Sequence, residues 1–355
     1  MRSLSVKAIK GNEILAKDLI GDGDKILLPA GCKLKIEYRE HLLRLGIESV
    51  YIKDEISKGV LNDRVSEDAI KDECLADVKN TLERFSYNAD TEENHISNIA
   101  EEIINDVLQE KNVVYCLAGV RQRSEGIYSH SINVAVLSIL IAVKMGVAKS
   151  RIKDIAIGSL LHDIGYNGVT VKMTNEPGQT YTDEEKKEIK KHVLYGYSMI
   201  SNEAWLSKTS KDIILSHHEM INSKGYPFHL DGDHMSLAIK IVSLCNDFDT
   251  LVYGRFGKPI KIHDAIAYII SQSGVRYEHS VVAAFNEVVA AYPNGTIVVT
   301  NEKEIGIVLR QNQKCPTRPV IRLLQDKSGK RYSKWVEKDL TTCLTLFIED
   351  TLETI

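Results

Sequence analysis

The sequence is poor in the features that identify several protein classes. Its six cysteines are scattered through 355 residues, and no two are separated by just two residues, which argues against a zinc ribbon and a disulfide framework. The longest apolar stretch, Ile132–Val143, is interrupted by Asn133 and Ser138, so it predicts a buried helix rather than membrane insertion. With no positively charged start before an apolar core, we expect no signal peptide and a cytoplasmic protein.

A strong excess of charge is also missing. The formal net charge is -4 at pH 7, whereas domains that bind nucleic acids usually carry a strongly basic face. We therefore expect no polymeric nucleic acid as a partner. A phosphate ligand would have to be bound by a few local lysines or arginines.

Apolar periodicity and turn residues divide the chain into four segments. Short β-prone runs predict a small β-rich N-terminal module over residues 1–60, and a charged helical pattern predicts a helical connector over 61–114. Successive helical patterns predict a large helical domain over 115–295, followed by a β-rich segment over 296–355. The fold class expected is mainly α. The connector is either a solvated helical pair or a surface for homodimer formation or signal relay, because exposed apolar stripes need a partner.

Several elements can be placed inside these segments. Thr182 and Glu185 form a capping-box pattern, which predicts one helix from there to about Ile200. Other helices are expected at Ser131–Met145, Ile152–Ile164, Lys211–Glu219, Ser236–Tyr253, His263–Ser271 and Glu278–Ala291. Strands are expected at Val6–Ile9, Ser49–Ile52, Thr296–Thr300, Gly306–Arg310, Pro319–Leu324 and Leu344–Phe347.

Histidine is crowded into one part of the chain. Seven of the eleven histidines lie between residues 130 and 234. The adjacent pair His162-Asp163 offers a metal an imidazole and a carboxylate from one turn, and the second carboxylate oxygen is free to bridge another ion. His192 shares a helix face with Ile189, Gly196 and Met199, so its ring is expected to point into the core. His217-His218 adds two more imidazoles.

Each of these histidines alone is more simply explained as a structural residue satisfied by a backbone carbonyl. Five histidines and an aspartate, each near a helix with an apolar face, favour a shared metal site instead. The cluster is rich in imidazole and carboxylate and lacks thiolate, which suits hydrolysis at a pair of metal ions. Cys245 is expected to be a buried core residue.

The order and spacing of these motifs resemble a known family. His130, Leu160-Leu161-His162-Asp163-Ile164-Gly165, Lys191-His192 with Gly196, His217-His218-Glu219 and Gly225-Tyr226-Pro227 are together similar to the HD-GYP family of bacterial cyclic di-GMP phosphodiesterases. The resemblance covers about residues 115 to 295. The flanking β-rich segments resemble accessory modules of that family more weakly.

The resemblance implies an all-helical domain that binds two or three iron or manganese ions and uses activated water to open a phosphodiester. His130, His162 and Asp163 would bind one metal ion, and Asp163 would bridge to a second ion bound by His192, His217 and His218. Asn246 stands at the last metal-ligand position. The substrate implied is cyclic di-GMP, hydrolysed to pGpG and on to GMP. Asp163 and Tyr166 would be catalytic, and Tyr226, Arg255 and Lys258 would bind the substrate.

The sequence departs from the family pattern at several of these positions. Asn246 replaces an aspartate, and its neutral oxygen should hold a metal ion less tightly. Tyr166 replaces a lysine, although its phenol can still donate a hydrogen bond. Gly126 stands where members with three metal ions have a glutamate, which favours two ions here. Two further departures are Asn222-Ser223-Lys224 before the Gly-Tyr-Pro motif and the tyrosines that flank Gly196.

Three functions stay open on the sequence. Retention of most metal-ligand positions favours a metal-dependent phosphodiesterase for cyclic di-GMP. Asn246 and Tyr166 favour a non-catalytic receptor for a cyclic dinucleotide. A phosphohydrolase for another nucleotide, such as a mixed cyclic dinucleotide, is the third, because fold does not fix substrate.

Overall fold

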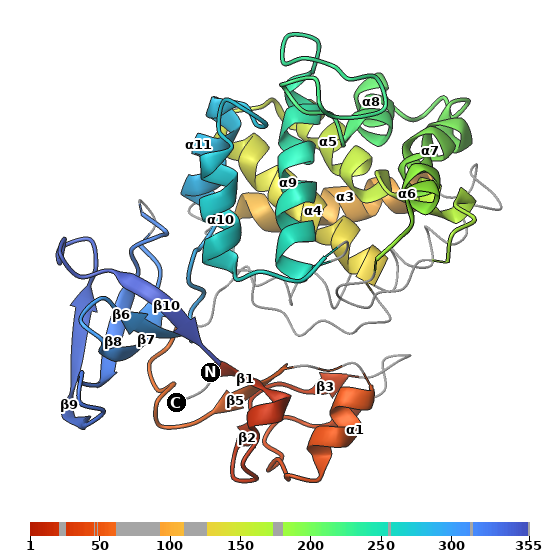
Figure 1. Cartoon of the computed structure of the whole chain (residues 1–355). Helices are drawn as coiled ribbons and strands as arrows, with labels where there is room; N and C mark the ends of the chain where they lie inside the picture. Colours follow the sequence, from red (N-terminus) through yellow and green to blue (C-terminus); the bar gives the residue numbers. More distant parts are fainter. Residues whose placement is uncertain are drawn as a thin grey trace. The chain divides into compact units, whose positions relative to one another are not determined.

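The chain forms two compact units, and each is described by itself (Figure 1). The computed structural model describes residues 1–20, 26–45, 47, 49–61, 93–109, 126–172, 180–254, 257–312 and 315–353. One unit is helical and comprises Glu67–Tyr115 and Glu125–Val288, whereas the other combines Met1–Ser66, Cys116–Ser124 and Val289–Ile355.

The helical unit is built around three helices that pack on one another. Helix α4 packs against both α5 and α9, and α8 covers α5 (Figure 1). The elements of this unit are α3 (Glu93–Gln109), α4 (Gly126–Lys144), α5 (Lys149–Leu161), η4 (Ile164–Gly168), α6 (Asp183–Lys190), α7 (His192–Ile200), α8 (Lys208–Ser216), α9 (Leu237–Tyr253), α10 (Ile262–Ser271) and α11 (His279–Val288).

Helix α4 is the most deeply buried element. Every residue from Ser129 to Ala142 is buried, as expected for a helix that is apolar nearly all round. The helix begins at Gly126, one turn earlier than predicted. Because neighbouring helices surround it, a polar side chain on α4 has to be satisfied inside the core.

The helix predicted to run from Thr182 to Ile200 is in fact two helices. The capping box between Thr182 and Glu185 is present and starts α6. Helix α6 ends at Lys190, and α7 begins at His192. The single-helix prediction was wrong because the apolar spacing continues across the break, so periodicity alone does not reveal it.

Helix α3 lies inside the stretch predicted as a connector. Its apolar side chains are buried, and α3 packs against α4 and α5. The stripe includes Ile96, Ile99, Ile103, Ile104 and Val107. The apolar stripe of α3 therefore finds its partners within the helical unit. Residues 62–92 and 110–114 of the predicted connector lie outside the described residues.

The second unit is mostly β-structure. Its largest sheet is antiparallel, with the strand order β10-β6-β7-β8-β9, and its two smaller sheets have the orders β1-β5-β2 and β3-β4. The bounds are β1 (Arg2–Ser5), β2 (Ile14–Leu15), β3 (Leu19–Ile20), β4 (Ile26–Leu28), α1 (Tyr38–Arg44), β5 (Ser49–Lys53), β6 (Ile297–Thr300), β7 (Ile305–Arg310), β8 (Val320–Gln325), β9 (Arg331–Asp339) and β10 (Ile348–Leu352).

Two strand predictions were wrong in detail. Val6–Ala8 forms a 3-10 turn after β1 rather than a strand, and the last strand begins at Ile348, beyond the predicted Leu344–Phe347. Strand β9 was missed altogether. It lies at the sheet edge and is mostly exposed, so no run of alternating apolar residues marks it.

The two β-rich ends of the chain, treated as separate segments in the sequence, meet in this unit. Leu61 N donates to Leu309 O at 3.0 Å, and Val60 packs with Ile297, Ile307 and Leu309. The segment that follows β5 therefore covers part of the largest sheet. Among the described residues, no helix is both long and apolar enough to cross a membrane.

Candidate metal centre

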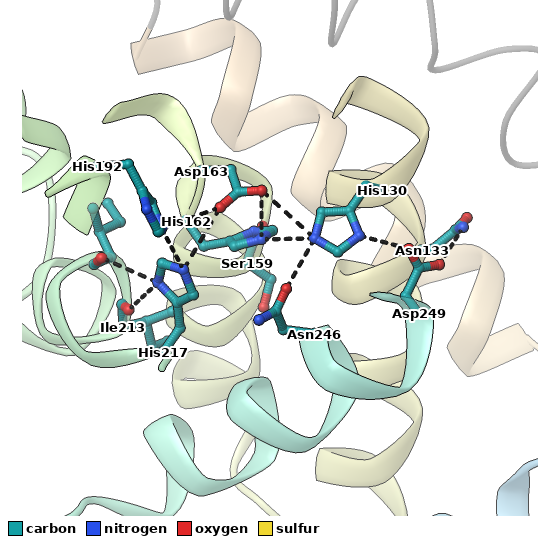
Figure 2. Close-up of polar contacts among 11 residues, drawn as sticks. His130, Asn133, Ser159, His162, Asp163, His192, Ile213, His217, Asn246 and Asp249 are labelled. Carbon is teal, nitrogen blue, oxygen red and sulfur yellow. Dashed lines mark hydrogen bonds and ion pairs between the residues drawn. The ribbon is translucent and has the colours of Figure 1, made fainter. Parts of the chain in front are cut away.

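A cluster of histidines, one aspartate and one asparagine lies in the core of the helical unit (Figure 2). His130 and Asn246 come from within α4 and α9. His162 and His217 cap the C-terminal ends of α5 and α8, and His192 is the first residue of α7. Helix ends thus bring the side chains of three sequence motifs to one place.

Close backbone packing next to Asp163 requires glycine. A Cβ added to Gly165 would lie 1.8 Å from the carbonyl oxygen of His192 and 2.4 Å from the backbone nitrogen of Gly196. No side chain fits there, so η4 can pack directly on α7. This contact holds Asp163, which precedes η4, close to His192.

One half of the cluster surrounds Oδ2 of Asp163. This oxygen lies 3.6 Å from Nε2 of His130 and 3.3 Å from Nε2 of His162. Nε2 of His130 also lies 3.1 Å from Nε2 of His162 and 2.9 Å from Oδ1 of Asn246. We call His130, His162, Asn246 and Oδ2 of Asp163 the asparagine position.

The other half surrounds Oδ1 of Asp163. This oxygen lies 3.6 Å from Nε2 of His192 and 3.6 Å from Nε2 of His217, and the two nitrogens are 3.2 Å apart. The potential ligand atoms of Asp163, His192, His217 and His218 all lie within 4.8 Å of one another. We call these three histidines and Oδ1 of Asp163 the three-histidine position.

The tautomers of the histidines follow from what their other ring nitrogens contact. Nδ1 of His162 and of His192 lies 2.7 and 2.8 Å from a backbone carbonyl oxygen. Nδ1 of His217 likewise faces the carbonyl oxygens of Ile213 and Ile214 at 3.2 and 3.1 Å. A carbonyl only accepts hydrogen bonds, so each Nδ1 carries the proton and each Nε2 presents a lone pair.

Lone pairs therefore converge in both halves of the cluster. Nitrogens that only accept cannot hydrogen-bond to one another or to a carboxylate oxygen, so their close approach costs energy without a cation between them. A divalent ion bound by imidazole nitrogen and oxygen removes that cost. The donor set present fits a metal centre.

Most of the potential ligands are shielded from solvent. His130, His162, His192 and His217 are at most 1% exposed. Burial lowers the pKa of His217, and burial together with the neighbouring histidines lowers the pKa of His218 well below its usual value. Neutral imidazole is the form that binds metal.

His218 is partly exposed, whereas the other residues of the cluster are buried. Tyr166 stacks on His192 with ring centroids 4.3 Å apart, and Tyr226 stacks on His218 at 4.6 Å. Both tyrosines are partly exposed. The ammonium of Lys190, at the end of α6, lies 5.1 Å from the centroid of the Tyr226 ring. Two aromatic rings and one cation thus lie beside His192 and His218.

Two neighbouring aspartates of α9 have different roles. Oδ2 of Asp249 lies 2.5 Å from Nδ1 of His130, so a carboxylate orients this imidazole from behind. Oδ2 of Asp247 instead accepts hydrogen bonds from Nη2 of Arg276 at 2.6 Å and from the hydroxyl of Tyr277 at 2.8 Å. Asp247 therefore does not replace Asn246 in the cluster.

Glu219 organises the loop that carries Tyr226. It is 0% exposed, and its two carboxylate oxygens accept hydrogen bonds from the backbone nitrogens of Phe228 and Leu230 at 2.6 and 2.9 Å. A Cβ on Gly225 would lie 2.4 Å from Cα of Glu219, so the loop folds back closely on this residue.

The structure brings together most of the predicted site residues. His130, His162, Asp163, His192, His217, His218 and Asn246 form the cluster, with Tyr166 and Tyr226 against it. Lys258 is exposed in the loop after α9, and no described residue joins it to the cluster by a hydrogen bond or ion pair. Arg255 lies outside the described residues. Cys245 is fully buried, as predicted, and burial raises its pKa to about 12.

The sequence interpretation missed three residues that now belong to the site. Asp249 could have been found because it follows Asn246 by three residues and so shares its helix face. Glu219 follows His217-His218 directly, but its contacts depend on the loop conformation. Lys190 is one of several charged residues of α6, and nothing in the sequence marks its contact with Tyr226.

The sequence matches known protein families and curated proteins. The family model described as "HD domain" matches residues 101–281, and the model described as "KOW domain associated with HD domain" matches residues 297–354. A cyclic di-GMP phosphodiesterase of Pseudomonas aeruginosa is 29% identical over 230 residues, which cover 64% of this chain and 55% of that protein.

Two further similarities are informative. A 3'3'-cGAMP-specific phosphodiesterase of Vibrio cholerae is 30% identical over 175 residues, covering 48% of this chain and 33% of that protein. The solved structure of Bd1817, a HDG"Y"P protein of Bdellovibrio bacteriovorus, superposes with a TM-score of 0.51 at 19% identity, covering 81% of this chain and 98% of that one. The latter similarity concerns the fold alone. The chain spans about half the length of the first curated relatives that it matches.

Proposed function

Because the chain belongs to the HD domain family, we propose that it is a metal-dependent phosphodiesterase that hydrolyses cyclic di-GMP. The observation that carries the proposal is the convergence of histidine Nε2 atoms on both oxygens of Asp163. This arrangement suits two divalent ions bridged by one carboxylate. The curated relatives named as cyclic di-GMP phosphodiesterases support the substrate.

Two ions, iron or manganese, would be bound at the three-histidine position and the asparagine position. When bound, such ions polarise a phosphoryl oxygen and lower the pKa of water. The contribution of the chain is to hold the ligands in place. The backbone carbonyls and Asp249 fix the rings, and Asp163 sets the separation of the two positions.

The residues beside His192 and His218 would bind the substrate. Tyr226 offers a ring face beside His218, where a base or a sugar can pack. Tyr166 stacks on His192, and its phenol could donate a hydrogen bond to a phosphoryl oxygen. Lys190 joins Arg255 and Lys258 as a cationic group for phosphate, as suits lysine and arginine.

Two alternatives to cyclic di-GMP hydrolysis remain to be tested. The similarity to a 3'3'-cGAMP-specific phosphodiesterase favours a mixed cyclic dinucleotide as the alternative. Asn246 and Tyr166 support another alternative, a receptor that binds a cyclic dinucleotide without hydrolysing it. All three functions use the same cluster, so only turnover separates them.

The chain's location and assembly are also part of the proposal. We place it in the cytoplasm, where cyclic dinucleotides act as messengers, and assign homodimer formation to the part of the 61–114 connector that precedes α3, because the apolar stripe of α3 is already buried within the helical unit. Light scattering of the whole chain and of a variant lacking residues 62–92 would test that assignment. An unchanged dimer in the shortened variant would contradict it.

The function is tested by incubating metal-loaded protein with cyclic di-GMP, 3'3'-cGAMP and cyclic di-AMP and separating the products. The proposal predicts fastest loss of cyclic di-GMP, with pGpG appearing first and GMP later. A chelator should abolish the reaction. Faster hydrolysis of 3'3'-cGAMP would make that nucleotide the substrate in place of cyclic di-GMP. Binding of all three nucleotides without any product would favour the function of a non-catalytic receptor.

A further inference from the structure

We propose that the two metal positions fill in order, with the three-histidine position binding the first ion tightly and the asparagine position binding the second ion weakly. The inference rests on the proposed metal centre and extends it to regulation. It predicts an intermediate, one-ion form of the protein whose abundance depends on the supply of metal.

The cluster carries little negative charge. Among the described residues of the cluster, Asp163 is the one carboxylate whose oxygens face the histidine Nε2 atoms. Every other donor is a neutral imidazole or the neutral amide of Asn246. Two divalent ions therefore share a single negative charge, and the first ion bound repels the second.

The two positions differ in the ligands that they offer, and this difference sets which position fills first. The three-histidine position offers three imidazoles, whereas the asparagine position offers two imidazoles and an amide oxygen. Imidazole nitrogen is the stronger ligand for iron and similar transition metals, and an amide oxygen is a weak one. With Asp163 shared equally, this difference favours the three-histidine position.

Asp249 instead favours the asparagine position. Asp249 lies behind His130 and raises its strength as a ligand, whereas backbone carbonyls lie behind His192 and His217. This effect acts through one ring on one metal bond. The extra imidazole of the three-histidine position would form one more bond to the metal ion, so we expect it to outweigh the indirect effect of Asp249.

The order has a consequence for activity. A phosphodiester clamped between two ions requires both positions to be filled. Since the second position is the weak one, turnover should follow its occupancy and rise with metal concentration after the first ion is bound. Asn246 would therefore make hydrolysis sensitive to metal supply.

Calorimetric titration of metal-free protein with Mn²⁺ under anaerobic conditions tests the order. We expect two classes of site whose dissociation constants differ by at least about tenfold. Asn246→Asp adds a carboxylate to the asparagine position and should tighten the weak class by about tenfold or more, leaving the strong class nearly unchanged. Asn246→Ala should weaken or remove the weak class alone.

Electron paramagnetic resonance assigns the classes independently of activity. One equivalent of Mn²⁺ should give the spectrum of an isolated ion, and a second equivalent should give a spin-coupled pair. His218→Asn should weaken the strong class. Asn202→Asp, which adds the same charge at an exposed position after α7, is the matched control and should change neither class.

The outcomes separate this inference from the proposed function. Two equal sites in the wild type, or an Asn246→Asp variant that tightens the strong class, would overturn the filling order. If the two positions fill in order but the protein hydrolyses no cyclic dinucleotide, the filling order stands and the proposed phosphodiesterase function is wrong. Circular dichroism of each variant checks that it is folded.

Discussion

Nδ1 of His130 lies 2.5 Å from Oδ2 of Asp249, so a carboxylate on α9 holds a buried imidazole of α4 from behind. Asn133 donates a hydrogen bond to the other oxygen of Asp249 at 2.7 Å. Both oxygens of this buried carboxylate are thus engaged, and the Nε2 lone pair of His130 faces Asp163 (Figure 2).

Asp249→Asn should weaken metal binding without removing a metal ligand. Loss of the carboxylate lowers the basicity of His130 and loosens its orientation, which typically costs about 10- to 100-fold in metal affinity. Calorimetry with Mn²⁺ measures the change. Asp247→Asn on the same helix is the control, because Asp247 contacts Arg276 and Tyr277 instead of the cluster. Equal losses in both variants would contradict the role of Asp249.

Glu219→Gln should destabilise the loop that carries Tyr226. The amide oxygen replaces only one of the two acceptor oxygens, so the other partly buried backbone N–H faces an NH2 group and loses its acceptor. The free energy of unfolding should fall by about 1 to 3 kcal/mol, measured by urea unfolding of metal-free protein. Glu287→Gln, at an exposed ion pair with Lys144, should change it by less than about 1 kcal/mol. Similar losses in the two variants would argue against a buried role for Glu219.

Lys190→Ala should weaken substrate binding and leave the metal centre intact. Removing a cation next to Tyr226 should raise KM for cyclic di-GMP by about tenfold, the size of one charged hydrogen bond. Steady-state kinetics of metal-loaded protein measure this change. Lys187→Ala, another exposed lysine of α6, serves as the control. An unchanged KM in Lys190→Ala would exclude the residue from the substrate site.

Tyr166→Phe separates the ring of Tyr166 from its hydroxyl. The ring should still stack on His192, so metal affinity should stay the same. If the hydroxyl donates a hydrogen bond in the transition state, kcat should fall by about tenfold. Wild-type kcat in this variant would show that Tyr166 acts only through its ring.

The helical fold could be predicted well from the sequence because its signals are local. The all-round apolar character of α4, the capping box of α6 and the Ser236 cap of α9 each mark an element where the structure has one. Strand β9 carries no such signal. Its pairing with β8 comes from a hairpin at the sheet edge, where exposed charged residues are tolerated.

The residues of the cluster could be predicted from the sequence, but the contacts around them could not. Motif spacing singled out residues that the structure brings into one cluster, because helix ends and helix faces position them. The break between α6 and α7 and the contact of Lys190 with Tyr226 have no marker in the sequence. The separate roles of Asp247 and Asp249 depend on the residues that pack around α9, and these are distant in the sequence.

The most direct test of the account is turnover of cyclic di-GMP by protein purified anaerobically and loaded with iron or manganese. His162→Ala and Asp163→Ala, prepared in the same way, are the controls. The account predicts hydrolysis to pGpG by the wild type and none by either variant. Tight binding of cyclic di-GMP by the metal-loaded wild type without hydrolysis would contradict it.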